Sequence, residues 1–164
     1  MRKAALQKHT PSVVALSRQN LPQLSGHIAE SVVQKGAYVL SGESKGADLV
    51  IFSNGGELHL ATQLAAMLEP KFKVAVVSTP CWEWFFAQDK AYQDEVLMRQ
   101  VKARISIEAG VSLGWERFVG TDGLIIALDE YGQSAPAEKL ADVFGFTPEK
   151  IYKKLVSHWP QFKN

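Results

Sequence analysis

Residues 48–68 read DLVIFSNGGELHLATQLAAML, and this stretch decides the fold class. Its first five residues are almost continuously apolar, which is typical of a strand that is covered on both faces of a sheet. A turn containing two glycines follows at 53–57. From Leu58 to Leu68, apolar side chains then recur at spacings of three and four residues, as they do along one face of a helix. A strand, a turn and a helix in this order predict an α/β fold.

Short apolar runs elsewhere in the chain predict the rest of the sheet. Residues 12–17, 74–78, 104–107 and 124–128 are rich in β-branched side chains and have the length of strands. A short edge strand is expected at 38–40. The chain therefore predicts a three-layer α/β sandwich with a mostly parallel, roughly five-stranded sheet.

The end of the chain predicts a helix that begins at Thr147. The hydroxyl of Thr147 can accept hydrogen bonds from free backbone amides, and Pro148 is well suited to the first helical position. Ile151, Leu155 and Trp159 then fall on one side. We expect this helix to cover a face of the sheet.

Composition and charge narrow the possible functions. The chain has 164 residues, 18.1 kDa, 46% hydrophobic residues and a formal net charge of +1, values typical of one soluble globular domain. The basic residues are spread along the chain, so we expect no nucleic-acid partner. No apolar run approaches the roughly twenty residues that span a bilayer, so no membrane association is expected. A single cysteine, Cys81, suits a reducing compartment, and we expect a cytoplasmic protein.

The loops after the predicted parallel strands are the candidate binding sites, because such sheets bind ligands at the carboxyl ends of their strands. The turn with Gly55 and Gly56 opens a helix and could hold an anion, but the carboxylate of Glu57 would repel a phosphate there. We interpret these glycines as structural. Glu108 and the pair at 129–130 place carboxylates at two further strand ends. Such groups serve acid–base catalysis, helix capping or arginine binding, and the pattern leaves these alternatives open.

Residues 79–86, TPCWEWFF, are too aromatic for a solvated loop. They should pack either against the domain or against a partner, and an interface with a partner is favoured. Cys81 has no neighbouring base in the sequence and is interpreted as a structural thiol. The four histidines show no spacing typical of a zinc site, so no metal site is expected.

Several stretches of the chain fall in an order that resembles one family. They are 15–22 (ALSRQNLP), 77–83 (VSTPCWE) with Phe85 and Gln88-Asp89, 107–110 (IEAG), 114–115 (GW), 119–120 (VG), 132–137 (GQSAPA) and 144–147 (FGFT). Across residues 10–155 they resemble the C-terminal domain of transketolases. The stretches 17–20 and 132–136 favour transketolase over the related thiamine-dependent dehydrogenase β-subunits and deoxyxylulose phosphate synthases. Two departures stand at 53–57, where many transketolases carry T-G-S-E, and at Cys81, where serine is usual.

The resemblance implies a thiamine-diphosphate enzyme of the pentose phosphate pathway that transfers a two-carbon ketol unit between sugar phosphates. It implies a homodimer of three-domain chains, with the cofactor and a divalent metal, magnesium or calcium, held in the first two domains. This chain would bind no cofactor, hold no catalytic residue and be inactive alone. It would support the dimer and its neighbouring domain.

The resemblance also divides the chain and assigns one site residue. Residues 1–23 correspond to the last strand and linker of the preceding pyrimidine-binding domain, and 24–164 to the C-terminal domain. Arg18 corresponds to an arginine that contacts the substrate phosphate, and a guanidinium fork suits phosphate oxygens. We expect residues up to about Gln23, without their original sheet partners, to be disordered or used between chains.

Two other classes of function stay open. The chain could be a separate subunit or regulatory module of a split thiamine-diphosphate enzyme, docking through residues 82–86. Less favoured is a small-molecule-binding α/β domain that uses Gly55 and Gly56. Finding the missing domains in a second chain would support the first, and binding of nucleotides or sugar phosphates would support the second.

Overall fold

The computed structural model describes residues 11–16, 20–22 and 29–163 of the chain. Five strands form one sheet in the order β1-β3-β2-β4-β5. Their bounds are β1 Tyr38–Ser41, β2 Leu49–Ser53, β3 Val74–Ser78, β4 Ala103–Ile107 and β5 Leu124–Ile126. Strands β2, β3, β4 and β5 pair in parallel and β1 pairs antiparallel with β3, so the expected mostly parallel sheet is confirmed.

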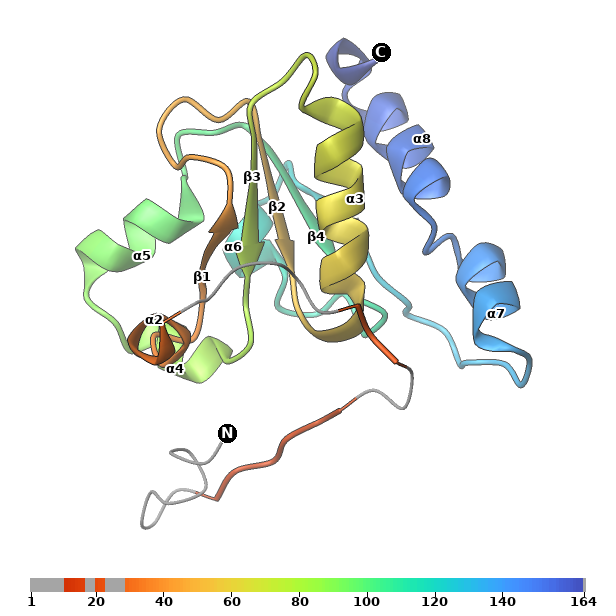
Figure 1. Ribbon diagram of the computed structural model, residues 1–164, viewed down its shortest axis with the longest axis horizontal. Helices are drawn as coiled ribbons and strands as arrows, with labels where there is room; N and C mark the ends of the chain where they lie inside the picture. The colour runs from red at the N-terminus through yellow and green to blue at the C-terminus, as the bar shows by residue number, and fades with distance from the viewer. Residues whose placement is uncertain (1–10, 17–19, 23–28, 164) are drawn as a thin grey trace.

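Helices cover both faces of the sheet (Figure 1). They are α2 Glu30–Val33, α3 Leu58–Leu68, α4 Trp82–Phe86, α5 Lys90–Leu97, α6 Glu116–Val119, α7 Ala137–Phe144 and α8 Pro148–His158, with short 3₁₀ turns η1 Gly55–Glu57 and η2 Pro160–Phe162. Helices α3 and α8 lie on one face, and α4, α5 and α6 contribute to the core on the other. The predicted three-layer α/β sandwich is therefore the observed architecture.

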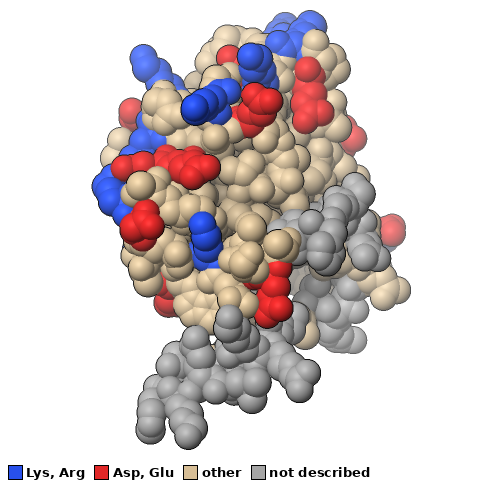
Figure 2. Space-filling model, turned by 60° about the vertical axis from the view of Figure 1, so that its left-hand side comes forward, with Lys and Arg blue, Asp and Glu red and all other residues tan. Residues whose placement is uncertain are grey.

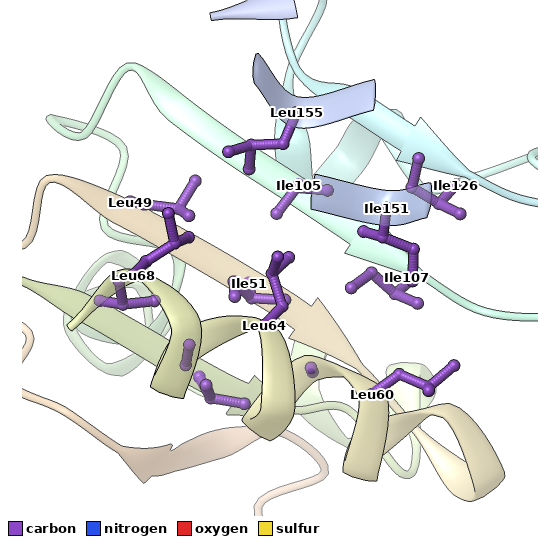
Figure 3. Close-up of a cluster of buried hydrophobic side chains, with 14 of the residues drawn as sticks. Leu49, Ile51, Leu60, Leu64, Leu68, Ile105, Ile107, Ile126, Ile151 and Leu155 are labelled. Carbon is purple, nitrogen blue, oxygen red and sulfur yellow. The ribbon is translucent and has the colours of Figure 1, made fainter. Parts of the chain in front are cut away.

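The first core lies between the sheet and helices α3 and α8 (Figure 3). Leu60, Leu64 and Leu68 point from α3 toward alternate residues of the strands, and Ile151 and Leu155 close the core from α8. Burial of such side chains contributes about 1.5–3 kcal/mol each. This packing explains why the apolar repeats of both helices could be recognised in the sequence.

The second core is rich in aromatic rings and lies on the opposite face of the sheet. Phe52 of β2 contacts Phe118 of α6 with ring centroids 5.6 Å apart, and Phe118 also stacks on Phe85 of α4 at 5.8 Å. Trp115 is only 1% exposed. Helices α4 and α6 are five and four residues long, so these ring contacts, more than helix length, hold them in place.

Two predictions about element boundaries can be compared with the structure. Thr147 accepts a hydrogen bond from the backbone N–H of Lys150 at the start of α8, which confirms the predicted helix start. The predicted strand at 12–17 is not confirmed, because residues 12–16 form no strand and the side chains of Val13 and Leu16 are 97% and 71% exposed. Figure 1 shows 11–16 as an extended segment away from the sheet.

The described surface mixes charges of both signs. On the face shown in Figure 2, lysine and arginine side chains alternate with aspartate and glutamate. Two of the close pairs are Lys90–Asp94 and Lys150–Asp142. Among the helices of the described part of the chain, none has the length and apolar character needed to cross a membrane.

Candidate functional site

The carboxyl ends of the four parallel strands meet at one edge of the sheet, which we call the carboxyl edge. It consists of the loops that follow β2, β3, β4 and β5. Parallel α/β sheets bind their ligands at this place. The candidate site residues Glu57, Glu108 and Asp129 all lie in these loops.

Buried hydroxyl groups tie the strand ends together below these loops. The hydroxyl of Ser53 donates a hydrogen bond to the backbone carbonyl of Ile107 at 2.7 Å. The backbone N–H of Thr79 donates to the carbonyl oxygen of Ser53 at 2.9 Å, and its hydroxyl donates to the same oxygen at 3.3 Å. Ser53 and Thr79 are 0% and 1% exposed. These bonds connect β2 with β4 and with the loop after β3, so the edge has a fixed base.

Glu57 and Glu108 bring two carboxylates near each other at the ends of β2 and β4. Burial raises the pKa of Glu57, and the negative charge of Glu108 raises it further, while a hydrogen bond from the backbone N–H of Ala109 opposes this rise. The carboxylate of Glu108 accepts a hydrogen bond from the indole N–H of Trp115 at 2.9 Å. Glu57 can therefore hold a proton above the usual carboxyl range, beside a Glu108 carboxylate that is hydrogen-bonded to Trp115.

Asp129 connects the loop after β5 to the loop after β4. Its carboxylate accepts the backbone N–H of Ser112 at 2.7 Å, and this bond lowers the pKa of Asp129. One residue earlier, the backbone N–H of Leu128 donates to the carbonyl of Gly110 at 2.8 Å. Asp129 thus joins the two loops, a structural role that differs from both the helix capping and the arginine binding considered from the sequence.

The glycine turn after β2 supports a structural interpretation. Gly55 has a φ of +52°, in the left-handed region, so it forms a turn that other residues adopt with strain. The position of a Cβ on Gly56 would be 3.7 Å from the side chain of Leu21, so the N-terminal segment contacts this turn. The nearby His59 ring is hydrogen-bonded to the carbonyl of Gly56.

The aromatic segment after β3 forms α4 and packs inside the domain. Phe85 is fully buried, and Trp82 contacts Trp115 edge-on with ring centroids 4.8 Å apart. Packing against the domain is therefore observed for Phe85 and Trp82, and the interface with a partner stays a prediction. Burial raises the pKa of Cys81, and its thiol lies 3.5 Å from the carboxylate of Glu83, which agrees with an unreactive thiol.

Sequence reasoning missed the contacts that make the loop after β4 rigid. Trp115 was noticed only as part of the Gly114-Trp115 stretch, but its indole N–H holds Glu108 and its ring holds Trp82. A Cβ on Gly114 would be 2.9 Å from the ring of Trp82, so only glycine fits there. A glycine before a tryptophan was the only available signal of this close packing.

Two expectations concern residues outside those that the structure describes. Arg18, the predicted substrate-phosphate contact, lies outside the described residues. The predicted boundary at 23 also falls in an undescribed stretch. Within the described residues, no group of three or more histidine, cysteine, aspartate or glutamate side chains could hold a metal ion.

Comparison with known families gives a match over most of the described domain. The model of the transketolase-like C-terminal domain (TK C-terminal domain) matches residues 36–147. This range includes the whole carboxyl edge and excludes the N-terminal segment.

Individual proteins and solved structures that match this chain are also transketolases. The transketolase of Halalkalibacterium halodurans is 44% identical over 147 residues, which are 88% of this chain and 22% of that protein. The structure of transketolase from Leishmania mexicana superposes with a TM-score of 0.78 at 35% identity, covering 90% of this chain and 21% of that one. A structure described as a split gene transketolase, inactive beta4 tetramer, shares the fold at 15% identity with a TM-score of 0.65, covering 89% of this chain and 49% of that one. The chain therefore spans about a fifth of the length of the first two relatives.

Proposed function

This chain belongs to the transketolase family, where it matches the C-terminal domain, and we propose that it acts as that domain of a thiamine-diphosphate-dependent ketol transferase. The observation that carries the proposal is the match to complete transketolases over nearly nine-tenths of the chain. The proposed reaction moves a two-carbon ketol unit from a ketose phosphate to an aldose phosphate. The proposed location is the cytoplasm.

The described residues do not fit the cofactor, so we assign its site to other domains. A diphosphate with its divalent metal needs several oxygen ligands on the metal and positive groups or free amides around the phosphates. The described residues contain no cluster of metal ligands, and the turn that opens α3 carries the Glu57 carboxylate. We derive no catalytic step through the cofactor on this chain.

The role that we propose for the domain is support of the assembled enzyme. Its Glu57, Glu108 and Asp129 carboxylates all accept hydrogen bonds from groups of the domain itself, and Ser53 and Thr79 fix the strand ends. These contacts suit a rigid body that steadies a neighbouring domain and a homodimer. Residues 1–23 are proposed to belong to the preceding domain and Arg18 to contact the substrate phosphate.

Ketol transfer from xylulose 5-phosphate to ribose 5-phosphate tests this function. The assay contains thiamine diphosphate and magnesium, and compares this chain alone with this chain plus a polypeptide that carries the two missing domains. We expect activity only in the mixture. Activity of the chain alone would refute the assignment of the cofactor to other domains, and an inactive mixture would refute the transferase role.

A separate subunit of a split enzyme is the second candidate function. A chain described as a split gene transketolase has the same fold, although at 15% identity this likeness concerns the fold alone. Purification of the protein from its source separates the two candidates. A 164-residue chain that copurifies with a second polypeptide would support the split enzyme, whereas one long chain would support the conventional form.

A further inference from the structure

We propose that the loops after β4 and β5 form the surface on which the preceding transketolase domains dock. The surface consists of Val111, Leu113 and Tyr131, and we call it the edge patch. The inference rests on the proposed function, since it names where the rest of that enzyme binds. It assigns docking to residues outside the aromatic segment that the sequence had favoured.

Exposure of large apolar side chains is the first observation. Val111, Leu113 and Tyr131 are 60%, 81% and 98% exposed, in a domain whose other large apolar side chains are mostly buried. Exposed apolar groups that gather in one place mark interaction surfaces. The two loops that carry them are joined, since Ser112 donates its N–H to Asp129.

Rigidity of the loop after β4 is the second observation. Glu108 and Trp115, near its two ends, are hydrogen-bonded to each other at 2.9 Å. Between them, the carbonyl of Gly110 accepts from Leu128, and the N–H of Gly114 donates to Glu116 at 2.9 Å. The apolar side chains are therefore exposed on a loop that is held in place. A preorganised surface loses little conformational entropy when a partner binds.

The path of the chain identifies the occupant. Leu21 packs on Gly56, and the next residue, Glu57, is hydrogen-bonded to Ala109 at the start of the loop after β4. Leu21 therefore lies at the carboxyl edge. The relatives place about four-fifths of their length outside the part that this chain matches.

The negative charge of the carboxyl edge indicates which charged side chains a partner surface would carry. The loops after β4 and β5, residues 108–115 and 127–136, contain three carboxylates and no lysine or arginine. A complementary partner would place apolar side chains on the edge patch and basic side chains around it. The occupant is thus the polypeptide with the two preceding domains, through an apolar surface with a basic rim.

Binding of this chain to a polypeptide with the first two transketolase domains tests the proposal. The variants are Leu113→Asp and Tyr131→Ala in the patch and Val143→Asp as the control. Val143 is 63% exposed on α7, outside the loops after β4 and β5, so its substitution adds the same charge at a comparable exposure. We expect Leu113→Asp to raise the dissociation constant about tenfold or more and Val143→Asp to change it less than about twofold. Thermal unfolding of each variant checks that the fold is kept.

The possible results separate the surface from the function. Equal binding by Leu113→Asp and Val143→Asp, with wild-type binding intact, would overturn the edge patch and leave the proposed function standing. Failure of the wild-type chain to bind would overturn both. Self-association of the chain alone that Leu113→Asp abolishes would show that a second copy occupies the patch, which overturns the proposed occupant.

Discussion

Two buried serines on neighbouring strands should respond in opposite ways to the same substitution. Ser53 and Ser106 are both 0% exposed, and replacing either with alanine removes one hydroxyl group. The hydroxyl of Ser53 donates to the carbonyl of Ile107 at 2.7 Å. The hydroxyl of Ser106 has no hydrogen-bond partner among the described residues. The pair therefore isolates the effect of one buried hydrogen bond.

The expected magnitudes follow from these surroundings. Ser53→Ala removes a donor from a buried carbonyl and should lower the free energy of unfolding by about 1–2 kcal/mol. Ser106 lies between Phe52 of β2 and Ile125 of β5, whose side chains belong to the aromatic core. Folding removes the hydroxyl of Ser106 from water and gives it no hydrogen bond in return, which costs free energy. Ser106→Ala should therefore leave the free energy of unfolding unchanged or raise it by up to about 1 kcal/mol. At about 2–4 °C per kcal/mol for a chain of this size, the melting temperatures of the two variants should differ by several degrees.

Urea unfolding followed by far-UV circular dichroism and tryptophan fluorescence measures the difference. The free energies are comparable only if the slope against urea stays constant, so the slope is reported for each variant. A loss of stability in Ser106→Ala equal to that in Ser53→Ala would refute the reasoning, because the hydrogen bond would then contribute nothing beyond the packing of the hydroxyl.

Three further predictions concern the core, a turn and a carboxyl group. In urea unfolding, Leu64→Ala should lower the free energy of unfolding by about 2–5 kcal/mol, since it opens a cavity between the sheet and α8, whereas Gln63→Ala, exposed on the same helix, should change it by less than about 0.5 kcal/mol. Gly36→Ala should lower the melting temperature far more than Gly46→Ala: both positions have positive φ, but a Cβ on Gly36 would lie 2.3 Å from a backbone oxygen, and one on Gly46 only 4.0 Å from a lysine side-chain nitrogen. Because the pKa of Glu57 is raised in the folded chain, its stabilising contribution is present below the unfolded value of about 4.3 and is lost as the pH rises through the folded value. Glu57→Gln should therefore gain stability relative to wild type between pH 4 and pH 7 in urea titrations, and a constant difference would contradict the raised pKa.

The strands and long helices could be predicted because their patterns are local. The run at 48–52 and the repeat from Leu58 to Leu68 each carry their signal within one element, and the structure places them in β2 and α3. The predicted strand at 124–128 was too long, since the backbone N–H of Leu128 binds Gly110 in the loop after β4 instead of continuing the parallel ladder. A competing partner in a distant loop leaves no local pattern.

The candidate site could be predicted only in its position. The rule for parallel sheets located the carboxyl edge, and it located Glu108 and Asp129 on it. The sequence did not reveal their partners, because these bonds join residues that only the fold brings together. Ser53 binds a carbonyl 54 residues away, and Ser112 binds a carboxylate 17 residues away.

The carboxyl edge combines carboxylates that are hydrogen-bonded within the domain with large apolar side chains that are exposed, and this combination suits a docking surface. Glu108 and Asp129 each accept a hydrogen bond from the loop after β4, so these contacts hold the loops of the edge in place. Leu113 and Tyr131, in contrast, have most of their surface in water, which costs free energy until another surface covers them. Substitutions at these two positions should therefore weaken the assembled enzyme while leaving the isolated domain as stable as before. Substitution of Trp115 should weaken the assembled enzyme and also destabilise the isolated domain, because the loop that presents Leu113 depends on the buried ring of Trp115.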